Sequence, residues 1–200
     1  MNIKEILSCY LEENKRVKVK LYILIHQLAY DPSPLKVIAK ASKTHFSIIR
    51  LFKIIILIHE CITIQMLPIV PTIELLKDLI NQAHKKKTKK SSPFEEMLLH
   101  NTIQPYVLYL QKKLDAQEQK NLSEEEQMFQ MFNLLKRGTS FVEILYTFGR
   151  YYLQEYTFIV DFNILMARDI NSLYDDVKIS ILKCKHLYDD LMRMELESIH

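Results

Sequence analysis

The sequence predicts a mostly all-α protein, with a helix-turn-helix or winged-helix unit at the N-terminus and then a helical bundle that ends in one long C-terminal helix. Three observations support this fold class. Only two glycines occur in 200 residues, while Leu, Ile, Lys and Glu are abundant, a composition that favours long helices with short polar connections. Apolar residues recur at spacings of three and four along much of the chain. A heptad pattern marks the last segment.

Two helices are predicted before residue 31. Apolar residues repeat with helical spacing from Ile3 to Leu11 and again from Val17 to Tyr30. These helices are expected to pack against a helix pair that begins at Leu35, which completes a three-helix core.

The helix pair lies in residues 31–58, DPSPLKVIAKASKTHFSIIRLFKIIILI. Ser33 followed by Pro34 supplies an N-cap and a first-turn proline for a helix over residues 35–42. After a polar interruption, helical spacing returns from Ile48. This order of elements predicts a helix-turn-helix, in which the second helix enters the major groove. An ordinary helical hairpin inside an all-α core fits the same pattern.

The second helix of the pair is the candidate DNA-reading element. Arg50 suits a guanine edge, whereas Lys43, Thr44 and Lys53 suit contacts to phosphate. The predicted double-stranded DNA-binding residues are Lys43, Thr44, His45, Ser47, Arg50 and Lys53.

A family resemblance adds to this interpretation. The segments KEILSCYLEENKRVKVKLYILIHQL and LKVIAKASKTHFSIIRLFKIIILI together resemble the N-terminal winged-helix segment of Mga-like transcription regulators of Gram-positive bacteria. The resemblance covers about the first 75 residues and rests on pattern. It implies duplex DNA binding by the residues listed above. The rest of the chain is too short for the large regulatory domains that such proteins carry.

The chain after the helix pair suggests a domain boundary. β-Branched residues interrupted by Pro68 and Pro71 predict a short, irregular two-stranded wing over residues 62–73, and a helix is expected from Ile73 to His84. The predicted domains are a helix-turn-helix-like domain (1–84), a basic linker (85–93) and an all-helical dimerisation or ligand-sensing domain (94–200). The lysines of the linker fit a solvated loop better than a phosphate-binding site.

The third region begins with a helical stretch over residues 94–116 that Pro105 interrupts. Ser123 and Glu126 form a capping box for a helix through Leu135, and the sequence KRGTS at 136–140 is expected to end that helix.

One long helix is predicted at the C-terminus, because apolar residues alternate there at spacings of four and three over nearly four heptads. Its seam could pair with a second subunit or with the rest of this chain. The residues predicted to dimerise are Ile170, Leu173, Val177, Cys184, Leu187, Leu191 and Met194.

Charge is distributed unevenly. Residues 1–90 hold 16 basic and 7 acidic side chains, a net charge of +9, and residues 91–200 hold 11 and 17, a net charge of −6. A basic first half is typical of a module that binds a polyanion.

Several classes of function lack support in the sequence. Nucleotide-binding loops and nucleophile elbows need more glycines than the chain has. No histidine or cysteine spacing indicates a metal site, and we expect no cofactor and no enzymatic activity. No apolar run is long enough to cross a bilayer, so a cytoplasmic protein without a membrane partner is expected.

These observations lead to a first hypothesis: a DNA-binding transcriptional regulator that forms a homodimer and can sense an unidentified small effector. The alternative is an all-α protein–protein interaction module that does not bind nucleic acid.

Overall fold

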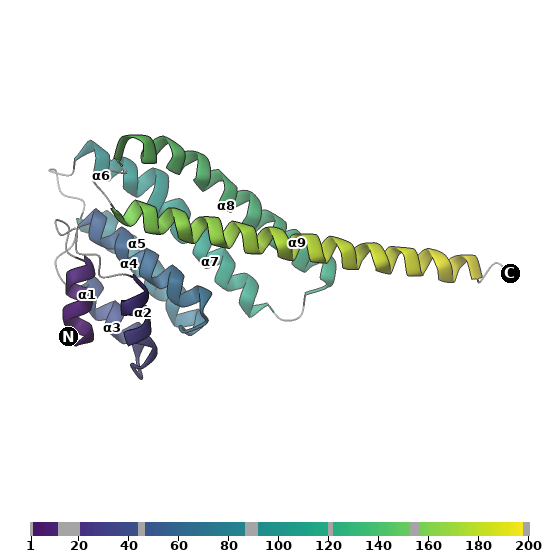
Figure 1. Ribbon diagram of the computed structural model, residues 1–200, viewed down its shortest axis with the longest axis horizontal. Coiled ribbons are helices and arrows are strands. Elements are labelled where there is room, and N and C mark those ends of the chain that lie inside the picture. The colour runs from purple at the N-terminus through teal and green to yellow at the C-terminus, as the bar shows by residue number, and fades with distance from the viewer. Residues whose placement is uncertain are drawn as a thin grey trace.

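The computed structural model describes residues 2–11, 21–43, 47–86, 92–119, 122–152 and 157–197, without the side chains of residues 86, 141–152, 157–158, 184 and 186–197. The described ranges contain helices and no strand (Figure 1). In chain order these are α1 (Ile3–Leu11), α2 (Leu21–Ala29), α3 (Pro34–Ser42), α4 (Ile48–Thr63), α5 (Ile69–Lys86), α6 (Pro93–Leu98), the π-helical turn η1 (Leu99–Ile103), α7 (Gln104–Glu118), α8 (Glu124–Tyr152) and α9 (Thr157–Glu197).

Helix α4 is the centre of the molecule. It contacts α1, α2 and α3 on one side and α5, α6, α7 and α9 on the other. Thirteen of its sixteen residues are buried, so the apolar run from Ile54 to Ile58 lies entirely inside the core. Ser47 caps the helix, since its hydroxyl oxygen accepts a hydrogen bond from the backbone N–H of Arg50 at 3.1 Å. The strongest apolar signal in the sequence therefore marks a core helix.

The predicted wing at residues 62–73 is wrong. This segment is the end of α4, a tight reversal and the start of α5. Gln65 adopts a left-handed conformation (φ 55°), and the backbone N–H of Met66 donates to the carbonyl of Cys61 at 2.9 Å. These are the features of a Schellman C-cap. Pro71 falls within the first turn of α5, where its missing N–H costs no helical hydrogen bond.

Helices α6 and α7 form the stretch that Pro105 was predicted to interrupt. The interruption takes the form of the π-helical turn η1, which lies immediately before Pro105 in the first turn of α7. Ser92 and Glu95 begin the stretch with a capping box.

Helices α8 and α9 lie side by side along much of their length (Figure 1). The capping box of Ser123 and Glu126 is present, with the Ser123 oxygen accepting from the Glu126 N–H at 3.2 Å. The predicted end of this helix at residues 136–140 is wrong, because α8 continues to Tyr152. Gly138 lies within it, and a Cβ atom there would stand 3.1 Å from Ile170 Cγ1 of α9. Glycine at this position allows the two helices to approach closely.

The mostly all-α fold class and the long C-terminal helix are confirmed. One cluster of buried apolar residues includes members from α1 to α9. The division into two domains stays a prediction. Within the described residues, no helix combines the length and the apolar character needed to cross a membrane.

Candidate functional site

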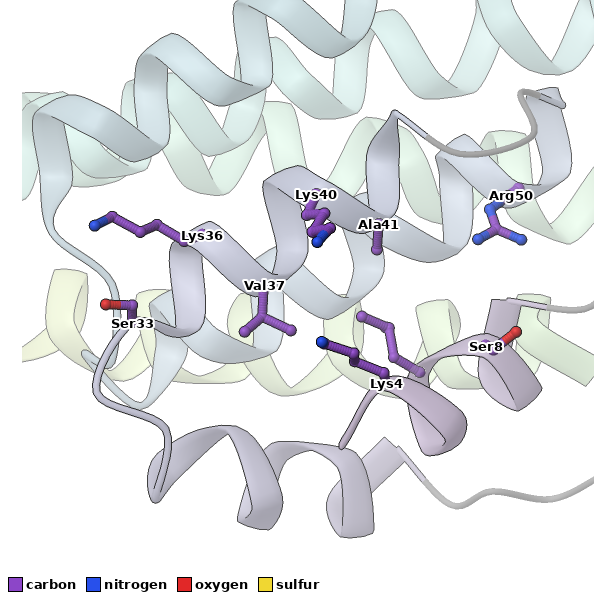
Figure 2. Close-up of a pocket in the computed structure, with 9 residues that line it drawn as sticks. Lys4, Ser8, Ser33, Lys36, Val37, Lys40, Ala41 and Arg50 are labelled. Carbon is purple, nitrogen blue, oxygen red and sulfur yellow. The ribbon is translucent and has the colours of Figure 1, made fainter. Parts of the chain in front are cut away.

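A pocket of about 350 Å³ lies between α1, α3 and the first turn of α4 (Figure 2). This volume is at the small end of the range typical of ligand sites. Apolar side chains and hydroxyl groups alternate with basic groups around it. The lining residues are Lys4, Leu7, Ser8, Ser33, Lys36, Val37, Lys40, Ala41 and Arg50.

The pocket follows directly from helical periodicity. Its residues from α1 recur at intervals of three and four, and so do those from α3 together with its N-cap. Residues spaced in this way share one face of a helix. One such face of α1 lies opposite one of α3 across the pocket. Leu11 of α1 and Ile38 of α3 do not line the pocket and are buried in the core. The lysines thus stand at the rim while shorter side chains form the floor (Figure 2).

Positive charge dominates the pocket. Four of its lining residues are cationic and none is acidic. Within the described part of the chain, Lys4, Lys36 and Lys40 form no ion pair. Two carboxylates lie near these residues in sequence: Glu5 accepts a hydrogen bond from the backbone N–H of Asn2 at 3.1 Å, and Asp31 accepts one from the backbone N–H of Ser33 at 2.8 Å. The pocket therefore favours a negatively charged group.

The predicted DNA-binding residues occupy different surroundings. Arg50 lines the pocket, Ser47 caps α4, and Lys43 is exposed at the end of α3. Thr44 and His45 lie outside the described residues. The expectation that Lys53 faces outward is wrong. Its Nζ is buried and donates to the carbonyl of Tyr10 at 3.2 Å.

The burial of α4 bears on how the predicted helix-turn-helix could work. A recognition helix presents side chains from successive turns to base edges. Of the α4 residues, Arg50, Glu60 and Thr63 are not buried, and Glu60 forms an ion pair with Arg168 of α9. Groove insertion of α4 would require this helix to leave the core.

A second polar cluster, the buried network, joins α4, α7 and α9. His59 Nε2 lies 2.9 Å from Asp169 Oδ2, and His59 Nδ1 lies 2.6 Å from the hydroxyl of Tyr106. The Tyr109 hydroxyl also donates to Asp169 Oδ2 at 2.6 Å, and Lys113 Nζ donates to Asp169 Oδ1 at 2.5 Å. The partners fix a neutral His59 that donates from Nε2 and accepts at Nδ1.

The ionisation of the buried network follows from these contacts. Burial lowers the pKa of His59, although the hydrogen bond to Asp169 opposes that shift. Burial alone would raise the pKa of Asp169, but the hydrogen bond from His59 and the charge of Lys113 hold that pKa well below its ordinary value. Burial raises the pKa of Tyr106 and of Tyr109. Asp169 is therefore the anion and Lys113 the cation of the network.

The order aspartate, histidine, hydroxyl is also found in catalytic triads. Here, however, His59, Tyr106 and Tyr109 are fully buried, so no substrate can reach them. The network therefore holds three helices together. Within the described residues, no group of three or more His, Cys, Asp or Glu side chains is placed to bind a metal ion.

The predicted dimerisation seam divides into two parts. Leu173 and Val177 are buried and Ile170 is partly buried beside Gly138 of α8, so this part packs within the chain. The structure does not describe the side chains of the remaining seam residues, which are Cys184, Leu187, Leu191 and Met194.

The last turns of α9 extend well beyond the other helices (Figure 1). We call residues 179–197 the distal arm. Ile179, Ile181 and Leu182, at the start of the arm, are each just over half exposed. Such a run of exposed branched apolar side chains is unusual on a monomeric surface.

Comparisons of the chain with models of known protein families, with curated protein sequences and with solved structures gave no match. The resemblance to Mga-like regulators stays a prediction.

Proposed function

We propose that the protein is an all-α interaction module that self-associates through the distal arm of α9. The observation that carries this proposal is the arm itself, a continuous helix that leaves the body while keeping apolar residues exposed (Figure 1). A single helix gains little stability in water without tertiary packing of its apolar face. A partner that covers the arm would supply that packing.

The sequence of α9 favours a second copy as the partner. The heptad pattern of the buried seam continues into the arm, so two arms offer each other the same apolar spacing. Charge also alternates along the helix. The acidic pair Asp175 and Asp176 is followed by basic Lys183 and Lys185, all exposed, and then by a second acidic pair at 189–190.

This charge order is self-complementary in an antiparallel pair. Two arms that cross near residue 186 place Lys183 of one copy level with Asp190 of the other, and the reverse. A parallel pair would place each lysine beside its own equivalent. The proposed dimer is therefore antiparallel, with a body at each end.

The proposal is tested with the double variant Leu187→Asp/Leu191→Asp, which places charge on the heptad seam of the arm. Circular dichroism checks that the variant keeps its helical fold. Sedimentation equilibrium should show a dimer dissociation constant at least about tenfold higher, a change of 1.4 kcal/mol. Ile164→Asp is the matched control, because Ile164 is exposed on α9 outside the arm and should leave association unchanged. A dimer that the double variant leaves intact would contradict the proposal.

Duplex DNA binding is the second candidate function, and the net charge of +9 over residues 1–90 favours it. Its test is binding to mixed-sequence duplex DNA across a salt series. A regulator would show affinity that falls steeply with salt and is lost in Arg50→Glu/Lys43→Glu. Lys53 is left unchanged, since its buried amine would make any loss of binding ambiguous. No binding at low salt would exclude this candidate.

A further inference from the structure

The geometry points to a ligand site in the pocket between α1, α3 and α4: it binds an organic anion that carries an apolar body, such as a medium-chain carboxylate or phosphate monoester. This site is separate from the distal arm, because α1 and α3 lie at the other end of the molecule from the end of α9 (Figure 1). It is therefore independent of the proposed self-association.

The negatively charged head group of the ligand is inferred from the basic side chains around the pocket. Lys4 of α1 lies opposite Val37 and Lys40 of α3, while Lys36 and Arg50 lie toward the two ends of the pocket (Figure 2). Like charges gathered on two helices repel one another, and a bound anion relieves that repulsion. Lysine and arginine both suit carboxylate and phosphate oxygens.

The apolar part of the ligand is inferred from the apolar side chains that line the bottom of the pocket. Leu7 is buried, and Val37 and Ala41 are partly buried, so the basic rim surrounds an apolar surface. Inorganic phosphate, or the hydrated backbone of a nucleic acid, would leave this surface without an apolar partner. Covering this surface with hydrocarbon removes apolar area from water, which favours binding.

Hydroxyl groups complete the site. Ser8 and Ser33 lie at its two sides (Figure 2). Ser33 is the N-cap residue of α3, yet its side chain makes no capping hydrogen bond. Its side-chain oxygen does not serve as a helix cap, and a serine hydroxyl can donate to an anionic oxygen.

The test is isothermal titration of the full-length protein with decanoate. Decanol supplies the same body without charge, and inorganic phosphate supplies charge without the body. Decanoate should bind with one site per chain, and each of the other two at least about tenfold more weakly. Equal affinity for decanol would mean a nonspecific apolar surface and would overturn the assignment.

Variants locate the binding. Lys36→Glu/Lys40→Glu should weaken decanoate binding at least about tenfold. Lys77→Glu/Lys85→Glu makes the same change in net charge at exposed lysines outside the pocket and should stay within about twofold. Circular dichroism checks that both variants fold, and Lys36→Gln/Lys40→Gln replaces the first variant if it does not. Equal affinity in the two pairs would contradict the site.

Competition with duplex DNA is the last part of the test. If a short duplex displaces decanoate, and does so through Lys36 and Lys40, the pocket belongs to a polyanion surface and the small-ligand assignment fails. If decanoate binding persists unchanged in excess duplex, the assignment holds.

Discussion

Helix α4 and the distal arm of α9 are both rich in branched apolar residues, but their surroundings differ. Most of helix α4 is covered, with thirteen of its sixteen residues buried, and Ile55, Ile56 and Ile58 have no exposed surface. In the arm, Ile181 and Leu182 are each more than half exposed. Apolar composition therefore does not distinguish a buried helix from an exposed one. What distinguishes them is the number of helices that pack around each one, and that number is a property of the tertiary structure.

The largest expected effect concerns Asp169, in the covered part of α9. Asp169→Ala leaves the N–H of His59 and the hydroxyl of Tyr109 buried without their acceptor, and leaves the partly buried Lys113 without its counter-ion. Removing one partner of a buried ion pair costs about 3–5 kcal/mol. Urea denaturation should show this loss in the free energy of unfolding. Asp175→Ala changes an exposed aspartate of the same helix and should cost less than about 0.5 kcal/mol. Equal losses would mean that the buried network does not stabilise the fold.

The second effect is the dependence of stability on pH. Burial lowers the pKa of His59 in the folded chain. Below pH 6.5 this histidine is therefore protonated more readily in the unfolded chain than in the folded chain. Stability should then fall as pH decreases through 6.5, the ordinary pKa of histidine. The pKa of Asp169 is also lowered, so its contribution is present above pH 3.8 and is lost as pH falls further.

Chemical denaturation at pH 7.5, 5.5, 4.0 and 2.5 measures this dependence. In His59→Gln the loss of stability between pH 7.5 and 5.5 should be smaller than in the wild type, while the loss below pH 4 remains. An unchanged loss in the variant would show that His59 is not the group responsible.

A third prediction concerns the contact between α8 and the covered part of α9. Gly138→Leu inserts a side chain where even a Cβ atom stands 3.1 Å from Ile170 Cγ1. Overpacking of this kind costs about 1–3 kcal/mol. Gly138→Ala should be nearly neutral, because a helix propensity gain of about 1 kcal/mol offsets the tight contact. Thermal unfolding compares the two, and a Leu variant as stable as wild type would argue against close packing at this point.

The smallest effect on folding is expected in the distal arm. Ile181→Asp/Leu182→Asp should change the free energy of unfolding, measured at a concentration where the protein is monomeric, by less than about 0.5 kcal/mol. A loss above about 2 kcal/mol would show that the arm packs within its own chain.

Local sequence signals predicted the helices well where the determinants are local. The capping box of Ser123 and Glu126, the interruption before Pro105 and the long C-terminal helix all follow from spacing along the chain. The wing failed because a Schellman reversal formed at Gln65, without the glycine that usually signals it. The predicted helix end near Gly138 failed because the residue serves a contact with Ile170, which lies far away in sequence.

The candidate site was only partly accessible from the sequence. Arg50 was selected, but Lys36 and Lys40 were not, although with Val37 and Ala41 they form the second face of α3. The spacing of these residues at three and four along α3 could have predicted a shared basic and apolar face. The outward orientation expected of Lys53 could not have been corrected from sequence, because its partner is the backbone of Tyr10.

The most direct test of the account is the molar mass of the intact protein across a concentration series, measured by light scattering. Self-association through the arm predicts a rise from 23.8 kDa, the mass of one chain, to a plateau at twice that value. A mass that stays at one chain at every concentration, or one that grows without a plateau, would contradict it.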